Sequence, residues 1–240
     1  MNKLFAHRGY NKGLATENSI ASLEEAVKNS FTAIEFDIWF FNNYLVIKHD
    51  KPKLQELSSL PKLRQYLKYG DILDYWCDFK NINEKNARIV AKTTRELVSD
   101  CQILPAKIFF TPYLPCNNIS RHQEYRKIFV EIRQEILPEL LPNTALEKGN
   151  KGFNLVAVID DMPNNATEQS KIFDFINSEN FDYFSIDHRL INQELLKIIE
   201  AKKILAWTVN NFNDLVRIRA LGIENFTSDT ICPKELDQKN

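Results

Sequence analysis

The sequence predicts an α/β fold, a (β/α)8 TIM barrel that takes in residues 1–240 as a single domain. Short apolar runs rich in β-branched and aromatic residues alternate with amphipathic helical patterns about eight times, which is typical of a parallel sheet with crossover helices. The length of 240 residues suits such a barrel. The alternative is a doubly wound open sheet, but the first strand-to-helix turn lacks a glycine-rich dinucleotide motif.

Each expected strand is a strand-sized apolar run bounded by a turn residue, a proline or a charge. Asn42-Asn43 is a turn signal, so the run after it is expected to return alongside the run before it. The strands are expected at residues 3–7, 33–40, 44–49, 73–80, 107–111, 153–159, 183–187, 204–209 and 225–228.

The expected helices carry apolar residues at helical spacing. Thr16 or Asn18 is expected to cap the first helix, Pro61 to open the second, and Gly222 to end the last. Residues 137–152 contain two prolines and two glycines and are expected to be a loop or a barrel insertion with no motif of their own. The helices are expected at residues 17–28, 60–69, 83–100, 118–137, 167–177, 192–201 and 213–221.

Composition excludes several classes of function. The formal net charge is -1 with Lys and Arg dispersed, so we expect no nucleic-acid partner. The apolar runs are far shorter than the roughly 18–20 residues of a membrane span, and the N-terminus runs into a strand, so we expect a cytoplasmic protein. The four cysteines show no CxxC spacing and are expected to be free thiols.

Two carboxylates lie on one face of the strand expected at residues 33–40. Side chains alternate along a strand, so Glu35 and Asp37 share one face, while Ile34, Phe36 and Ile38 share the other. The apolar face must meet the helices, so both carboxylates are expected to point into the barrel. Two ionised carboxylates are costly to desolvate there, and a bound cation is the simplest compensation.

A third carboxylate is expected near this pair. Asp78 and Lys80 lie two residues apart at the end of the strand expected at 73–80, so an all-oxygen site is predicted, which favours Mg2+ or Ca2+. The alternative is that these carboxylates only form ion pairs with Lys80 or Arg8.

Two histidines and an arginine are also expected at strand ends, on the barrel face where active sites lie. His7 and His49 suit acid/base catalysis near neutral pH, and Arg8 suits bidentate phosphate binding. Trp207 is expected either to line a substrate site or to pack in the core.

From residue 6 to residue 229 the chain resembles the glycerophosphodiester phosphodiesterases, a family of TIM-barrel enzymes. The combination and order of short motifs carry this resemblance more than any single motif does. The motifs are His7-Arg8-Gly9, Glu17-Asn18-Ser19, Ile34-Glu35-Phe36-Asp37, His49-Asp50, Asp78-Phe79-Lys80, Trp207-Thr208-Val209-Asn210 and Thr227-Ser228-Asp229.

The resemblance implies hydrolysis of a glycerophosphodiester to glycerol 3-phosphate and an alcohol. It also implies a role for each site residue. His7 and His49 would be the acid/base pair, Arg8 and Lys80 would hold the phosphate, Glu35, Asp37 and Asp78 would hold Mg2+ or Ca2+, and Trp207 would line the glycerol side.

The chain departs from the family at three places. Asp78 stands where the family usually has Glu, the run after His49-Asp50 is Lys51-Pro52-Lys53-Leu54, and only about thirty residues separate His49 from Lys80, so little or no capping insertion is expected. An open site favours a second hypothesis, a lysophospholipase D-like activity on lysophospholipids. A third is a degenerate barrel that binds a ligand or a protein without turnover, and a phosphoinositide-type phospholipase is a more distant relative.

Overall fold

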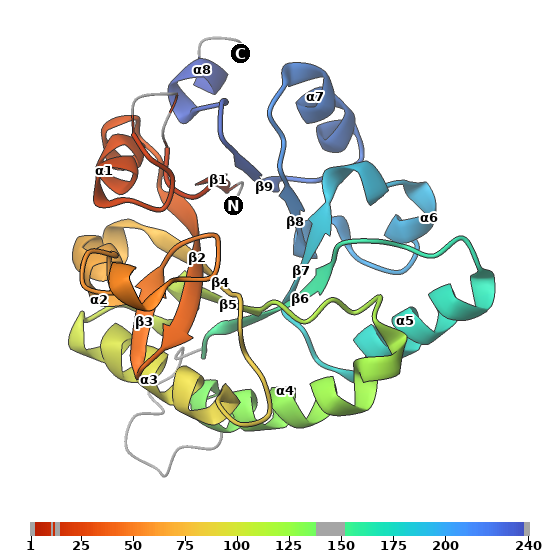
Figure 1. The fold of residues 1–240 in the computed structure, drawn as a ribbon. Coiled ribbons are helices and arrows are strands. Elements are labelled where there is room, and N and C mark those ends of the chain that lie inside the picture. The colour runs from red at the N-terminus through yellow and green to blue at the C-terminus, as the bar shows by residue number, and fades with distance from the viewer. Residues whose placement is uncertain (1–2, 11, 13–14, 138–151, 238–240) are drawn as a thin grey trace.

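The computed structural model describes residues 3–10, 12, 15–137 and 152–237. The predicted barrel is confirmed over this part of the chain (Figure 1). Nine strands form one sheet: β1 (Leu4–Ala6), β2 (Ala33–Phe41), β3 (Tyr44–Ile47), β4 (Asp74–Phe79), β5 (Ile108–Pro112), β6 (Asn154–Ile159), β7 (Tyr183–Asp187), β8 (Ile204–Trp207) and β9 (Asn225–Ser228).

The sheet closes because β1 pairs in parallel with both β2 and β9. The remaining barrel strands pair in parallel in the order β2-β4-β5-β6-β7-β8-β9. β3 is the exception: it pairs antiparallel with β2 alone and extends the sheet beyond the barrel, as the Asn42-Asn43 turn predicted. Closure brings the first and last strands side by side, and this places residues from both ends of the chain in one site.

The helices cover the outside of the barrel (Figure 1). They are α1 (Ile20–Lys28), α2 (Leu63–Tyr66), α3 (Ala87–Asp100), α4 (His122–Ile136), α5 (Ala166–Ser178), α6 (Gln193–Leu196), α7 (Phe212–Ala220) and α8 (Pro233–Asp237). Short 3-10 turns occur at Leu54–Glu56, Leu67–Ile72, Pro105–Lys107, Ile119–Arg121, His188–Leu190 and Ala201–Lys203.

Three expectations about the helices were wrong. The helix expected at 60–69 is α-helical only over Leu63–Tyr66, and a 3-10 turn follows in which Gly70 has a φ of 54°. The helix expected at 192–201 is α-helical only over Gln193–Leu196. Ser19, not Thr16 or Asn18, caps α1, because the Asn18 side chain is bonded to Asp37 instead. The loop expected at 137–152 lies almost wholly outside the described residues.

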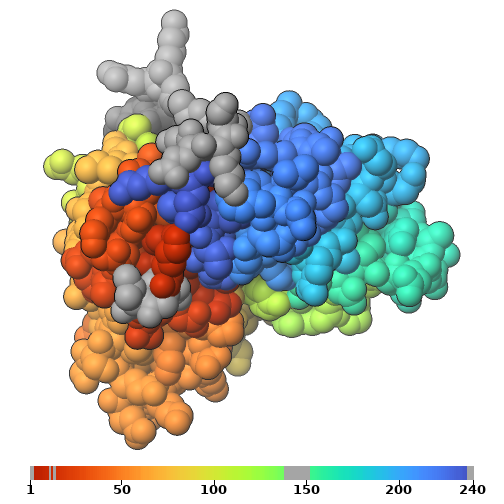
Figure 2. Space-filling model, turned by 90° about the horizontal axis from the view of Figure 1, so that it is seen from above, coloured from red at the N-terminus to blue at the C-terminus, as the bar shows by residue number. Residues whose placement is uncertain are grey.

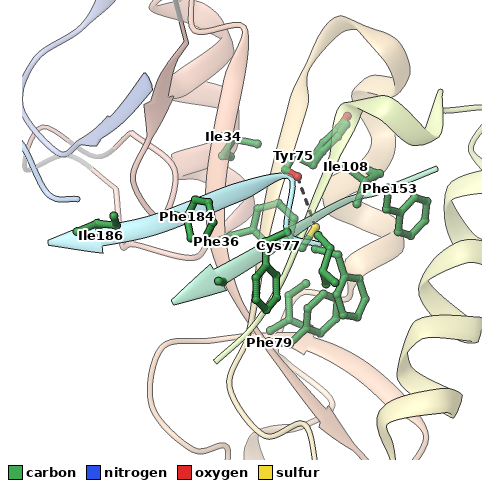
Figure 3. Packing of buried hydrophobic residues seen from close by; sticks show 14 of the residues in the cluster. Ile34, Phe36, Tyr75, Cys77, Phe79, Ile108, Phe153, Phe184 and Ile186 are labelled. Atoms are coloured by element: carbon green, nitrogen blue, oxygen red, sulfur yellow. Dashed lines mark hydrogen bonds between the residues drawn. The ribbon is translucent and has the colours of Figure 1, made fainter. Parts of the chain in front are cut away.

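The core has two parts, one on each face of the barrel wall. The outer part lies between the strands and the helices and contains Ile34, Phe36 and Ile38. Figure 3 shows Ile34 and Phe36 among the residues of this part. The inner part fills the barrel with Phe5, Ala33, Trp76, Phe109, Val156 and Leu205. Because apolar side chains fill the barrel below it, the polar site lies at the carboxyl ends of the strands.

The cysteines Cys77, Cys101, Cys116 and Cys232 are free thiols, as expected. Within the described ranges, no helix has the length and apolar character needed to cross a membrane.

Candidate active site

A cavity of about 400 Å³ opens at the carboxyl ends of the barrel strands. All eight residues predicted from the sequence line it: His7, Arg8, Glu35, Asp37, His49, Asp78, Lys80 and Trp207. Trp39, Trp76, Tyr113, Val158, Ser185 and Thr227 complete the lining. The cavity therefore brings together side chains from both ends of the chain and from its middle.

Three carboxylates converge on one side of the cavity. Glu35 and Asp37 lie on the inward face of β2, and the parallel register with β4 places Asp78 directly opposite Asp37. One oxygen from each of the three residues lies within 4.8 Å of the other two. Glu35 and Asp37 are almost fully buried, so this cluster of negative charge is shielded from bulk water.

Two cations lie against the carboxylates. Lys80 Nζ is 2.7 Å from Asp37 Oδ1 and 2.5 Å from Asp78 Oδ2. Arg8 Nε is 3.2 Å from Asp37 Oδ2, and its guanidinium also pairs with Glu17 at 3.1 Å. The ion pairs that the alternative interpretation expected are thus present. In the described structure, however, neither Lys80 nor Arg8 forms an ion pair with Glu35.

The pKa values of the carboxyl groups reflect this unequal pairing. Burial, together with the charge of Asp37, raises the pKa of Glu35 to about 7. Burial also raises the pKa of Asp78, against the charge of Lys80. Burial opposes ionisation of Asp37 too, but Lys80 and Arg8 outweigh it and hold the pKa of Asp37 below its ordinary value.

The carboxylate cluster fits a hard divalent cation. Asp78 Oδ1 is buried and has no hydrogen-bond partner within the protein, so it is available as a ligand. Oxygens on opposite sides of a bound ion are separated by about 4 Å for Mg2+ and about 5 Å for Ca2+, which agrees with a cluster that spans at most 4.8 Å. An all-oxygen set suits these two ions better than zinc.

His7 is held by a residue from the other end of the chain. Its Nδ1 lies 2.7 Å from Asp229 Oδ1, and its Nε2 lies 3.8 Å from Glu35 Oε2. Burial lowers the pKa of His7, but the hydrogen bond to Asp229 and the charges of Glu35 and Asp229 raise it, and the net pKa lies above the ordinary value. Because a carboxylate only accepts, Nδ1 carries a proton and Nε2 is the atom free to act in the cavity.

Asp229 is a site residue to which the sequence reasoning gave no role. Asn210 Nδ2 donates to Asp229 Oδ2 at 2.7 Å, and the Asp229 backbone N–H donates to Asn210 Oδ1 at 2.8 Å. The signal was present, because Ala6 of β1 lies opposite Ser228 of β9, so the residues that follow them, His7 and Asp229, are neighbours at the rim.

His49 occupies a more open position than His7. Its side chain is 42% exposed against 16% for His7, and its Nδ1 lies 3.0 Å from Asp50 Oδ1. The indole N–H of Trp39 donates to the His49 backbone carbonyl at 3.1 Å, which fixes the segment after β3 over the edge of the cavity. The two histidines therefore differ: His7 is half-buried among carboxylates, and His49 lies at the mouth of the cavity.

The turn after β1 depends on glycine. Gly9 has a φ of +79°, and a Cβ there would lie 2.3 Å from Ser22 Oγ. The Ser22 hydroxyl donates to the Arg8 carbonyl, and the Arg8 backbone N–H donates to Glu35 Oε2 at 3.0 Å. Close packing of this turn on α1 thus orients both Arg8 and Glu35.

Asn18 is the second residue whose part in the site was not foreseen. Its Nδ2 donates to Asp37 Oδ2 at 2.7 Å, and its Oδ1 accepts the Asp37 backbone N–H at 3.1 Å. Asn18 is buried and therefore fixes the orientation of a carboxylate in the cluster.

Aromatic and hydroxyl groups form the rest of the cavity wall. Trp207 is half-buried, lines the cavity and also packs against the inner apolar cluster, so it combines features of both expected positions. The Lys80 ammonium lies 5.0 Å from the centroid of the Tyr113 ring, whose hydroxyl donates to Asp160 at 2.9 Å. Trp76 Nε1 and Thr227 Oγ1 are buried polar atoms with no partner within the protein, so both are available to a bound group.

No protein-family model and no curated protein matches the chain. Solved structures do match its fold. A glycerophosphodiester phosphodiesterase from Parabacteroides distasonis aligns with a TM-score of 0.70 at 18% identity over 99% of this chain and 95% of that one.

Two further structures give the same result. A phosphodiesterase from Oleispira antarctica, in complex with the product sn-glycerol-3-phosphate, aligns with a TM-score of 0.65 at 17% identity over 98% of this chain and 95% of that one. A glycerophosphodiester phosphodiesterase from Thermotoga maritima aligns with a TM-score of 0.64 at 13% identity over 95% of both chains. The chain therefore has the fold of the solved glycerophosphodiester phosphodiesterases, as its motifs led us to expect.

Proposed function

We propose that this protein is a metal-dependent phosphodiesterase that hydrolyses glycerophosphodiesters to glycerol 3-phosphate and an alcohol. One observation carries the proposal: a single cavity holds two histidines, two cations and a cluster of three carboxylates. Solved enzymes of this name share the fold, and a product complex with sn-glycerol-3-phosphate exists for the Oleispira protein.

Glu35, Asp37 and Asp78 would hold Mg2+ or Ca2+. When bound, such an ion supplies positive charge that stabilises the phosphoryl oxygens as negative charge grows on them. A bound ion would also change the interactions of the protein cations Lys80 and Arg8. Lys80 and Arg8 now neutralise Asp37 and Asp78, and a divalent ion among the same carboxylates would leave them free to bind the phosphate.

The two histidines would move the protons of the reaction. One accepts the proton of the attacking hydroxyl as a new P–O bond forms, and the other donates a proton to the alcohol oxygen as the old P–O bond breaks. Asp229 holds the His7 ring so that Nε2 faces the cavity. The attacking hydroxyl is that of water or the 2-hydroxyl of the glycerol, and the second route passes through a cyclic phosphate.

Trp207 would form the wall for the glycerol carbons, since it lines the cavity on the side of β8, away from the carboxylates of β2 and β4. Paired carboxylates are also typical of glycosidases, but that function does not suit this site, because Glu35 and Asp37 come from one strand and cannot flank a scissile bond.

A panel of diesters tests the proposal. Glycerophosphocholine, glycerophosphoethanolamine and glycerophosphoinositol are incubated with the protein in EDTA, and then with Mg2+ or Ca2+ restored. We expect release of glycerol 3-phosphate that EDTA abolishes and one of the two ions restores, and 31P NMR detects any cyclic phosphate. Binding of the metal without any phosphate ester product would support the degenerate barrel and contradict the proposal.

A further inference from the structure

Two side chains at the rim of the cavity have no role in the proposed chemistry. Tyr113 lines the cavity directly after β5, and Asp160 comes directly after β6. Side chains alternate along a strand, so Asp160 continues the face of β6 from which Val158 lines the cavity. Neither Tyr113 nor Asp160 belongs to the motifs that carry the resemblance to the phosphodiesterases, so the family implies no role for them.

A hydrogen bond joins the two residues. The Tyr113 hydroxyl donates to Asp160 Oδ2 at 2.9 Å. Partial burial and the charge of Asp160 raise the pKa of Tyr113 to about 12, so the phenol keeps its proton at neutral pH. Donation to a carboxylate polarises the phenol and leaves its ring more electron-rich. The pair therefore presents a negative charge and an aromatic ring at the same place on the rim.

Asp160 differs from most carboxylates around the mouth because no cation of the described chain neutralises it. The carboxylates at the mouth that form ion pairs are Glu17, Asp37, Asp50, Asp78, Asp187 and Asp229. No lysine, arginine or histidine among the described residues forms an ion pair with Asp160, although it is half-buried. The charge of Asp160 is thus available to a group that enters from solvent.

The chemistry of the pair indicates an organic cation. Tyr113 is 41% exposed, and its ring already lies 5.0 Å from the Lys80 ammonium, so it is a ring that accepts a neighbouring cation. Aromatic faces attract ammonium groups, and the carboxylate of Asp160 adds an attraction of the same kind. A negatively charged group would be repelled by Asp160, and an apolar group would leave it without a counterion.

The position of the pair indicates which part of the substrate it contacts. Lys80, a proposed phosphate ligand, lies against the Tyr113 ring, whereas Trp207, the proposed wall for the glycerol, lies on β8 and is separated from β6 by β7. The alcohol on the other side of the phosphorus can therefore extend over Tyr113 toward Asp160. Only the ring and one hydrogen bond separate Lys80 from Asp160, so an ammonium two carbons from the ester oxygen is within reach.

The rim is uneven around the cavity. Figure 2 shows the orange part of the chain, which contains β3 and the residues after it, projecting from the rest of the surface. His49 belongs to this part of the chain and lines the cavity. Tyr113 and Asp160 follow β5 and β6, which are separated from β3 by β2 and β4. An alcohol that extends over Tyr113 therefore leaves the cavity on a side away from the projection.

We propose that Tyr113 and Asp160 bind the alcohol group of the substrate when it is a small organic cation, and so select diesters with a positively charged headgroup over those with a neutral or negative one. This inference rests on the proposed function, because it assigns two specificity-determining residues to the same cavity. The observation that carries it is the juxtaposition of an exposed aromatic ring with a carboxylate that has no counterion, directly beside Lys80.

A pair of substrates of equal shape tests the inference. One is glycerophosphocholine, and the other is its neutral analogue in which 3,3-dimethylbutanol replaces choline. The readout is the ratio of the two kcat/KM values in one protein, so a general loss of activity cancels. For the wild type we expect a ratio of about ten in favour of choline, the size of a cation–π contact combined with a partly exposed ion pair.

Variants of the pair and a matched control complete the design. Asp160→Asn keeps an acceptor for the Tyr113 hydroxyl but removes the charge, and Tyr113→Leu removes the ring; each should lower the ratio to about three, and the double variant to about one. The control Asp161→Asn makes the same change of charge at the next residue, which is exposed and bonded to the Met162 backbone N–H, and should keep the ratio.

Two results would overturn the inference. One is a wild-type ratio near one, and the other is an equal fall of the ratio in Asp160→Asn and Asp161→Asn, which would show an effect of overall charge. In both cases turnover of the two diesters would leave the proposed function standing.

If no diester is cleaved, the proposed function fails, and binding then decides the inference. Phosphocholine and 3,3-dimethylbutyl phosphate are titrated calorimetrically, in the presence of Ca2+, into the wild type, Asp160→Asn and Asp161→Asn. Phosphocholine that binds about tenfold more tightly than the neutral ester to the wild type and to Asp161→Asn, but not to Asp160→Asn, would support the site for a cation. Equal affinity for the two ligands in the wild type, or binding of neither, would overturn it.

Discussion

Replacing Asp229 by Asn tests whether this residue orients His7. Asp229 follows the last strand, and its contact with His7, after the first strand, joins the two ends of the chain at the site. The substitution keeps the shape of the side chain but removes the charge 2.7 Å from His7 Nδ1. The amide also presents either an oxygen or an NH2 group, so the ring of His7 is no longer fixed with Nε2 toward the cavity.

The size of the expected effect follows from the hydrogen bond that is lost. A hydrogen bond to a charged group contributes about 1.5–3 kcal/mol, which corresponds to a loss of about 10–150-fold in kcat. Removing the proposed acid/base group itself, as in His7→Ala, should lower kcat by about 10²–10⁴-fold. We therefore expect the kcat of Asp229→Asn to lie between those of the wild type and His7→Ala. KM should change little, because the substitution leaves Arg8 and Lys80, the proposed phosphate ligands, in place.

The assay is release of glycerol 3-phosphate from glycerophosphocholine at saturating metal. The matched control is Asp187→Asn, which alters a buried carboxylate at the end of β7 that is bonded to Arg189 and does not line the cavity. Full activity in Asp229→Asn, or an equal loss in Asp187→Asn, would refute the reasoning. A rise in KM with kcat unchanged would also count against the reasoning, because it would show that Asp229 acts in substrate binding.

Three further substitutions test the supports of the site. Asn18→Ala removes both hydrogen bonds to Asp37, so calorimetry should show divalent-cation affinity lowered by about 10–100-fold, and unchanged affinity would contradict this role. Gly9→Ala should lower the melting temperature by at least about 5 °C, because a side chain is unfavourable at a positive φ and its Cβ would lie 2.3 Å from Ser22 Oγ. A shift below about 1 °C would contradict the requirement for glycine in this turn. Lys80→Met leaves the buried Asp78 without its cation and Asp37 with Arg8 alone, at a cost of about 3–5 kcal/mol. Added Ca2+ should therefore raise the melting temperature of this variant more than that of the wild type, and an equal rise in both proteins would contradict the site.

Local pattern was enough to predict the strands and much of the site. The alternation Ile34, Glu35, Phe36, Asp37 fixes which side chains enter the barrel, because only the apolar set can pack on the helices. The same pattern in β4 placed Asp78 beside Asp37 once the strands were assumed to be parallel neighbours.

Contacts that depend on barrel closure were harder to predict. His7 and Asp229 are 222 positions apart in sequence, and they meet only because β1 pairs with β9. Asn18 was expected to serve as a helix cap, which is its common local use. Its bonds to Asp37 are tertiary, so helical propensity alone does not reveal them.

The most direct test of the account is turnover by His7→Ala and His49→Ala, measured together with metal binding by calorimetry. Neither histidine belongs to the carboxylate cluster, so both variants should bind Mg2+ or Ca2+ with affinity close to that of the wild type. Each should lose about 10²–10⁴-fold in the rate of glycerol 3-phosphate release from glycerophosphocholine. Full hydrolysis by both variants would contradict the assignment of this cavity as a two-histidine phosphodiesterase site.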